Sequence, residues 1–105
     1  MKGDPDAAVA DYDQAIALNP QYATAYNNRG VAYYQKGDLD RAMADFDQAI
    51  ALNPQYAMAY YDRGFTYVKL GEQEQAIADL ERALELGLDP QYKAQAEELL
   101  GNFGH

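Results

Sequence analysis

The sequence predicts an all-α protein, a solenoid of antiparallel helix pairs with six helices along the chain. The first observation behind this is a period of 34 residues: the stretch 21–54 and the stretch that begins at residue 55 share 14 of 34 positions. The second is that residues 1–20 repeat residues 35–54 at 15 of 20 positions, so the chain opens partway through a copy. A fixed period of this length is typical of helical repeat proteins. The third is that the turns are short, which makes successive helices antiparallel.

The 105 residues are expected to form one domain, long enough to bury a core. By the period, this domain contains a half repeat at 1–20, full repeats at 21–54 and 55–90, and a C-terminal capping helix at 91–105.

The first helix is expected from about Asp4 to Leu18. Asp4 followed by Pro5 is typical of an N-cap and a first helical residue, because proline has no N–H to lose there and its φ is already helical. Asn19-Pro20 should end the helix, since a residue before proline is pushed out of the α region. One apolar face follows from the spacing of Ala8, Tyr12, Ala15 and Ile16.

The second helix, expected over about 21–35, carries two stripes. One consists of Tyr26, Arg29, Gly30 and Tyr33. A second stripe on roughly the opposite side consists of Thr24, Asn27, Asn28, Val31, Tyr34 and Gln35. Its counterpart in the next copy consists of Met58, Tyr61, Asp62, Phe65, Val68 and Lys69. A helix of this kind has neighbours on both sides, or a neighbour and a ligand.

The remaining helices are expected at about 38–52, 55–70, 72–86 and 90–100. The third helix repeats the first, with Ala42, Phe46, Ala49 and Ile50 facing inward, and the fifth places Ala76, Leu80, Ala83 and Leu84 likewise. Gly30 and Gly64 put small residues where paired helices touch, which allows a close approach of the two axes. The spacer after Leu86 is two residues longer than its counterparts, so the last helix should lie at a different angle.

The order Tyr26-x2-Arg29-Gly30-x2-Tyr33, followed by Ala42-x3-Phe46, Ala49 and Pro54, resembles the tetratricopeptide repeat pattern. The resemblance extends over essentially the whole chain. Arg29 and Arg63 depart from the pattern, which usually has leucine there. A buried arginine needs a carboxylate, and Asp45 and Asp79 are the expected partners.

The resemblance implies a right-handed superhelix whose first helices line a concave groove that binds a peptide or a partner protein. The second stripe is the one that the family would place in this groove. Val31, Val68 and part of Tyr34 have an alternative role as core between neighbouring repeats. The candidate groove residues are Asn27, Asn28, Val31, Tyr34, Met58, Tyr61, Asp62, Phe65 and Lys69.

Family members that capture the acidic tails of heat-shock chaperones hold carboxylates with Lys, Asn and Arg side chains on successive first helices. Of the corresponding residues here, Asn28 alone fits. An apolar or mildly basic peptide is therefore the expected partner of this acidic surface. The positions compared are Asn27, Asn28, Val31, Met58, Asp62 and Phe65.

The formal net charge of −9 argues against nucleic acid and anionic membranes, because the eight lysines and arginines are scattered along the chain. No apolar run is long enough for a membrane span, and the N-terminus lacks the apolar region of a signal peptide. The lack of a signal or membrane segment predicts a cytoplasmic protein. The start partway through a repeat separately indicates a fragment of a longer array.

Catalysis is not expected, and neither a cofactor nor a metal is implied. His105 is the only histidine, and serine and cysteine are absent, so the common pairings of nucleophile and base cannot be assembled. Asp4-Pro5-Asp6 begins like a calcium loop, but it lacks glycine at the sixth place and glutamate at the twelfth.

Self-assembly is the alternative function. The first helix lacks a partner of its own repeat, and the last helix has no second helix after it, so head-to-tail homo-oligomers could complete both ends. Two other interpretations remain open: an excised piece of a longer array, and a polar face on the last helix that acts as a solvating cap. The end residues expected to have incomplete cover are Tyr12, Ile16, Leu18, Tyr92, Leu99, Leu100 and Phe103.

Overall fold

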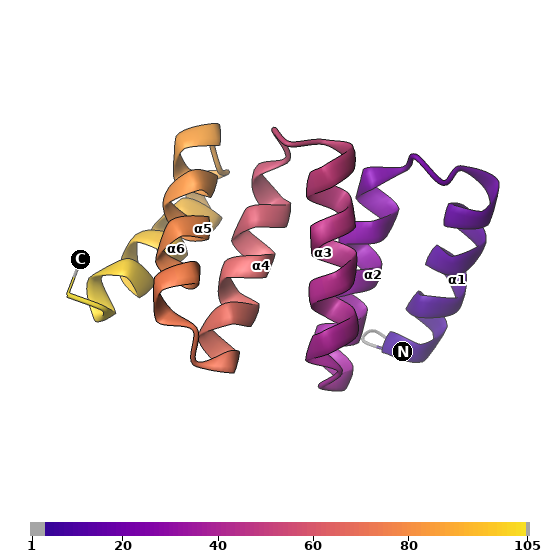
Figure 1. Ribbon diagram of the computed structural model, residues 1–105, viewed down its shortest axis with the longest axis horizontal. Coiled ribbons are helices and arrows are strands. Elements are labelled where there is room, and N and C mark those ends of the chain that lie inside the picture. The colour runs from indigo at the N-terminus through magenta and orange to yellow at the C-terminus, as the bar shows by residue number, and fades with distance from the viewer. Residues whose placement is uncertain (1–3, 105) are drawn as a thin grey trace. The chain divides into compact units, whose positions relative to one another are not determined.

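The computed structural model describes residues 4–104 (Figure 1). Residues 1–3 and His105 lie outside the described residues. Six α-helices and no strand occur between residues 4 and 104, which confirms the all-α prediction. The chain divides into two compact units, residues 1–54 and 55–105, and this boundary coincides with the start of a sequence period. Unit 1 contains α1 (Pro5–Leu18), α2 (Ala23–Lys36) and α3 (Leu39–Leu52), and unit 2 contains α4 (Ala57–Leu70), α5 (Gln73–Leu86) and α6 (Pro90–Asn102).

Aspartate caps begin α1, as Asp4-Pro5 predicts, and also α3. The Asp4 carboxylate accepts hydrogen bonds from the backbone N–H groups of Asp6 and Ala7 at 3.1 and 3.3 Å. The Asp38 carboxylate accepts one from the Arg41 N–H at 3.2 Å. These bonds satisfy donors that a helix leaves without an intrahelical partner at its N-terminus.

The helices α2 and α4 begin two residues later than the period predicted, at Ala23 and Ala57. Before α2 the chain makes a turn in which Asn19 accepts hydrogen bonds from Gln21 N and Tyr22 N. Tyr22 is therefore an N-cap with non-helical dihedrals and not part of the helix.

Glycine ends the same two helices. Gly37 and Gly71 follow α2 and α4 with φ of 83° and 79°, the left-handed region that glycine adopts without a steric penalty. The next N–H reaches back to a tyrosine carbonyl one turn earlier, and α3 or α5 then begins within two residues.

In unit 1, α2 packs against both α1 and α3. Glycine makes the α2–α3 approach possible, because a Cβ at Gly30 would lie only 2.6 Å from Cε1 of Phe46. Ala42, Phe46 and Ala49 of α3 are each at most 1% exposed. The close contact inferred from small residues is therefore present.

In unit 2, α4, α5 and α6 share one buried cluster. Its members are Tyr61, Leu80, Ala83, Ala96 and Leu100. Tyr92 and Leu99 pack against it but remain only half-buried, so their cover is incomplete as expected. Leu100 is 7% exposed, and the expectation of incomplete cover is wrong for this residue. Figure 1 shows α6 inclined to α5, as the longer spacer predicts.

Both expected arginine pairs are present. Arg29 donates to Asp45 from Nε and Nη2 at 2.9 and 2.7 Å, and Arg63 donates to Asp79 in the same way at 2.7 and 2.8 Å. The two aspartate side chains are nearly buried, while each arginine side chain keeps about a fifth of its surface exposed. Planar guanidinium and carboxylate groups favour this two-bond geometry.

Candidate peptide-binding surface

On α2 of unit 1, the second stripe is partly open to solvent. Asn28, Val31 and Tyr34 are half-buried, whereas Asn27 is only 3% exposed. The first three thus present surface that a partner could contact, and Asn27 presents almost none.

On α4 of unit 2, the five candidate residues differ more in their exposure to solvent. Met58, Asp62 and Phe65 are half-buried, and Lys69 is exposed. Tyr61 is only 5% exposed and belongs to the buried cluster of the unit. As the chain is folded, Tyr61 therefore offers a ligand little surface.

Tyr61 joins α4 to α6. Its hydroxyl donates a hydrogen bond to Oε1 of Gln95 at 2.8 Å. Its ring packs edge-on against the rings of Phe65 and Tyr92, with distances between ring centroids of 4.7 and 5.3 Å. Burial, helped by the neighbouring Asp62 carboxylate, raises the pKa of the Tyr61 hydroxyl to about 12. The tyrosine thus remains a neutral donor that holds α6 in place.

An open pocket of about 390 Å³ lies beside this contact in unit 2. Phe65 of α4 forms one wall, and the lining residues of α6 are Gln95, Glu98, Leu99 and Asn102. The sequence analysis identified Phe65 but missed the α6 side of the pocket. A signal was present, because residues 95, 98, 99 and 102 fall on one face of a helix at the 3.6 period.

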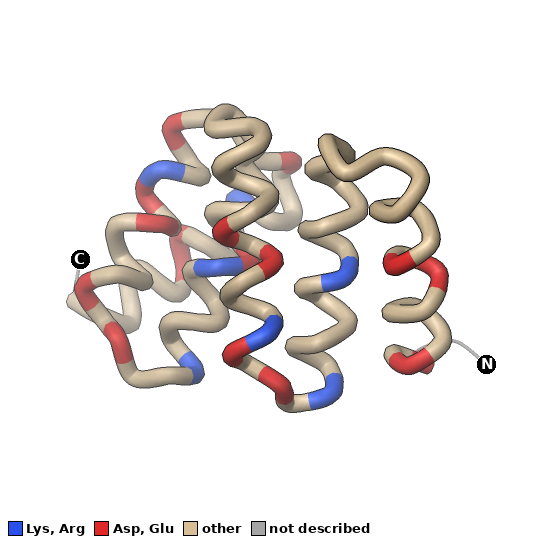
Figure 2. The backbone as a smooth tube through the Cα atoms, turned by 45° about the vertical axis from the view of Figure 1, so that its right-hand side comes forward, with Lys and Arg blue, Asp and Glu red and all other residues tan. Residues whose placement is uncertain are grey.

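The pocket combines apolar surface with negative charge. Phe65 and Leu99 supply the apolar part, and Glu98 is exposed at the lining. Acidic residues outnumber basic residues along the chain, 17 to 8, and Figure 2 shows where both lie on the backbone. Within α6, Glu97 and Glu98 are accompanied by a single lysine, Lys93. Such a surface is complementary to an apolar side chain next to a cationic one.

Between residues 4 and 104, no group of three or more His, Asp or Glu side chains is arranged to hold a metal ion. In the same part of the chain, no helix has the length and hydrophobicity needed to cross a membrane.

Solved structures of known proteins resemble the chain over nearly its full length. The first TPR of Spaghetti (RPAP3), bound to the HSP90 peptide SRMEEVD, is 28% identical with a TM-score of 0.85, and the match covers 99% of this chain and 83% of that one. The Arabidopsis OM64 TPR domain is 30% identical with a TM-score of 0.85, covering 94% and 82%. YrrB, described as a TPR protein with an unusual peptide-binding site, is 26% identical with a TM-score of 0.78, covering 90% and 48%.

No curated protein matches the chain significantly. Family models do match: a TPR repeat model covers residues 2–37 and 32–71, and a tetratricopeptide repeat model covers residues 57–87. Helix order, glycine contacts and sequence period agree with these matches, and the chain belongs to the tetratricopeptide repeat family.

Proposed function

We propose that this chain is a non-catalytic interaction module whose unit 2 binds a peptide segment with an apolar side chain beside a basic one. The observation that carries the proposal is the pocket in which Phe65 and Leu99 lie next to Glu98. The apolar side chain would displace water from the two hydrophobic walls, and the basic group would pair with the carboxylate. Asn28, Val31 and Tyr34 on α2 offer unit 1 a contact surface of its own.

The similar structures support peptide binding as the general activity. Two TPRs of Spaghetti (RPAP3), 28% and 32% identical to this chain, are bound to the HSP90 peptide SRMEEVD. That peptide carries three acidic residues and one arginine. This chain has a net charge of −9, and Glu98 lies at the pocket, so we infer a preference for the opposite charge.

Matched heptapeptides test the proposal. One set has a central leucine or phenylalanine flanked by lysines, and the other has glutamates in place of the lysines. We expect the lysine set to bind more tightly, and both Phe65→Ala and Leu99→Ala to weaken binding at least about fivefold, as truncation of a contact residue does. Leu18→Ala on α1 removes an exposed leucine outside the pocket and serves as the control.

The two classes of failure have different meanings. If the lysine peptides bind and neither Phe65→Ala nor Leu99→Ala weakens their binding, the site lies elsewhere on the chain. Preference for the glutamate peptides, with the pocket variants still weakened, would keep the pocket and overturn the inferred ligand charge.

Head-to-tail assembly through both end helices receives less support. Leu100 of α6 is 7% exposed and packs inside its own unit, so it is not free to complete another copy. Leu18, 87% exposed, and Tyr22, 45% exposed, leave apolar surface uncovered near the α1 end.

A further inference from the structure

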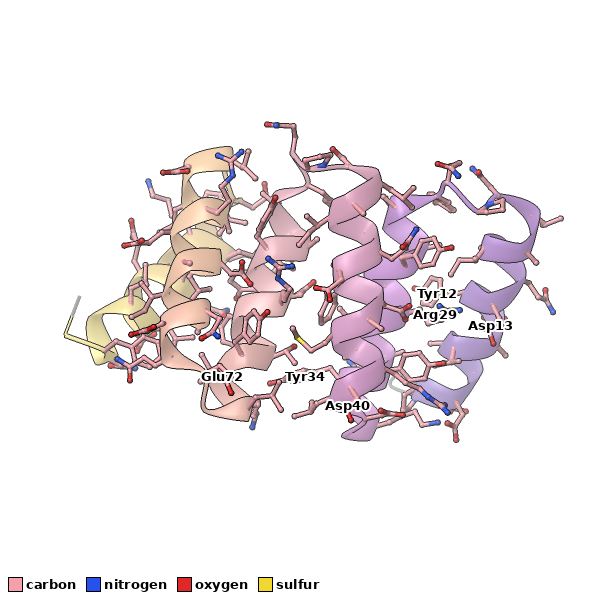
Figure 3. The ribbon with its side chains drawn as sticks, viewed as in Figure 1. Tyr12, Asp13, Arg29, Tyr34, Asp40 and Glu72 are labelled. Carbon is pink, nitrogen blue, oxygen red and sulfur yellow. The ribbon has the colours of Figure 1, made fainter. Side chains whose placement is uncertain are left out.

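The side-chain amide of Gln95 is engaged on its acceptor side and unused on its donor side. Its Oε1 accepts the hydrogen bond from the Tyr61 hydroxyl at 2.8 Å, and between residues 4 and 104 its Nε2 has no acceptor. Arg29 of α2, by contrast, uses its donors on Asp45 and on Asp13 (Figure 3). Gln95 thus keeps two N–H donors for a group from outside the chain.

Tyr61 fixes the direction of these donors. The tyrosine is 5% exposed, and its ring packs against those of Phe65 and Tyr92, so the hydroxyl has a set position. Because an amide group is planar, a bond to Oε1 also sets where Nε2 lies. Burial raises the pKa of the hydroxyl to about 12, so at neutral pH it stays protonated and keeps the acceptor side of the amide. A donor that is held in place before binding loses less conformational entropy when it engages a ligand.

Gln95 stands beside the apolar and acidic parts of the unit 2 pocket. Residues 95, 98 and 99 all line it, and they are three and four positions apart on α6. They therefore lie on one face of the helix, within about 6 Å of each other along its axis. An extended peptide advances about 3.3 Å per residue. An apolar side chain seated between Phe65 and Leu99 thus brings the adjacent main chain within reach of Gln95.

The main chain of the peptide supplies the acceptor that suits this donor. A lysine or arginine flanking the apolar residue has no side-chain acceptor, and the apolar side chain has none either. The backbone carbonyls next to the seated side chain are then the nearest acceptors. A second amide at the pocket, that of Asn102, makes no side-chain hydrogen bond within the described residues, so nothing fixes its direction.

We propose that Gln95, positioned by Tyr61, donates a hydrogen bond to a main-chain carbonyl of the bound peptide next to its apolar side chain. Gln95 is then a specificity-determining residue, because it selects a segment whose carbonyls are not already used inside a helix. The inference rests on the proposed function, from which it takes the ligand.

An exchange of amide for carboxylate tests the donor. The probe is the heptapeptide with a central leucine flanked by lysines, and its affinity for the full chain is measured by fluorescence anisotropy. Gln95→Glu keeps an acceptor for the Tyr61 hydroxyl but has no N–H donor. We expect it to weaken binding at least about fivefold, although its new charge attracts the lysines. Asn102→Asp makes the same change on the other amide and should leave the affinity unchanged or raise it up to about threefold.

Ester analogues of the peptide locate the acceptor. In each analogue an ester replaces one backbone amide, and the ester carbonyl is the weaker acceptor. The analogue with the ester next to the leucine should bind the parent chain about fivefold more weakly. Against Gln95→Met, which lacks the donor and adds no charge, the same ester should cost less than about twofold. A loss caused by the missing N–H of the ester would persist in this variant.

The positioning role of Tyr61 has its own measurement. Tyr61→Phe leaves the amide of Gln95 in place but no longer holds its direction, so the cost of the ester should fall below that in the parent chain. An ester cost that Tyr61→Phe leaves unchanged would overturn this role, whatever the variant does to stability.

Failure of this inference can be told from failure of the proposed function. If Phe65→Ala weakens the lysine peptide but Gln95→Glu strengthens it as Asn102→Asp does, the role of Gln95 is overturned and the pocket is kept. An ester cost that is equal in the parent and Gln95→Met chains has the same meaning. A parent chain that binds no lysine peptide at about 1 mM would overturn the proposed function and this inference with it.

Discussion

Arg29 and Asp45 meet through two parallel hydrogen bonds, from Nε to Oδ2 at 2.9 Å and from Nη2 to Oδ1 at 2.7 Å. The hydrogen bond to Asp45 raises the pKa of the Arg29 guanidinium, against the lowering effect of burial, so the arginine stays charged. The pair occupies the place where the family pattern has an apolar residue on the first helix. A polar contact thus replaces part of the hydrophobic packing between α2 and α3.

Breaking this pair from one side should cost more than removing it entirely. Arg29→Leu alone is expected to lower the free energy of unfolding by about 3 kcal/mol, because the nearly buried Asp45 carboxylate is left without its partner. Asp45→Asn alone should cost less, because Arg29 keeps its ion pair with Asp13. The double variant should recover part of that loss. Urea unfolding followed by circular dichroism measures all three, with the exposed pair of Arg82 and Glu85 as the control, worth about 0.5 kcal/mol or less.

Alanine at Gly30 should destabilise the chain more than alanine at Gly64. The new Cβ would meet the Phe46 ring at 2.6 Å but Cγ of Leu80 at 3.0 Å. We expect Gly30→Ala to cost about 1–3 kcal/mol through overpacking, even after the gain in helix propensity. Gly101→Ala has open space around it and should be neutral or stabilising by up to about 1 kcal/mol. A Gly30→Ala chain as stable as the parent would refute the close contact.

Tyr61→Phe should change the response of the fold to alkaline pH. The pKa of the Tyr61 hydroxyl is raised from 10.0 to about 12 in the folded chain. Between these values the unfolded chain releases the proton while the folded chain keeps it. Stability is therefore unaffected by this group below pH 10 and falls as the pH rises to about 12, by at most about 1.4 kcal/mol per pH unit.

The Tyr61→Phe variant lacks this loss, although it also gives up a hydrogen bond worth about 1 kcal/mol to Gln95 at neutral pH. Urea unfolding from pH 8 to 11.5 compares the two chains. Curves that stay parallel across this range would contradict the burial of the hydroxyl.

Charge reversal at the pocket should reverse the peptide preference. Glu98→Lys is expected to weaken lysine-flanked peptides and to strengthen glutamate-flanked ones, each by about fivefold at low salt, because surface ion pairs contribute modestly. Glu74→Lys makes the same change in net charge on the first turn of α5 and is the matched control. If both variants act alike, the effect comes from the net charge and not from the pocket. Higher ionic strength should reduce the effect in either case.

The helix pairs and the arginine contacts could be predicted because the period fixes them. Any residue of α2 has its counterpart 34 residues later in α4. A prediction that Arg29 pairs with Asp45 therefore also predicts that Arg63 pairs with Asp79. The starts of α2 and α4 could not be read in this way. The first two residues of each predicted helix, Gln21 and Tyr22 or Gln55 and Tyr56, lie before the observed helix. In the case of α2 they form a turn organised around Asn19.

The α6 wall of the pocket and the burial of Tyr61 were not predictable from the same pattern. A helical stripe shows that a neighbour or ligand lies on that side but not which of the two it is. For Tyr61 the neighbour is α6, reached through Gln95 and Tyr92. Because the longer spacer breaks the period before α6, positions on α4 could not be matched to positions on α6.

Arg29 also donates to Asp13 at 2.8 Å, so a single side chain of α2 holds carboxylates from both of its neighbours, α1 and α3. In a linear array of repeats, the free energy of unfolding is approximately the sum of the stabilities of the individual repeats and of the interfaces between neighbours. The Arg29 side chain contributes to two such interfaces, one with α1 and one with α3. Fraying of α1 from its end would remove one counter-ion from a guanidinium that α3 also uses. Unit 1 should therefore unfold cooperatively as a block of three helices. Loss of α1 would destabilise the contact between α2 and α3 through Arg29.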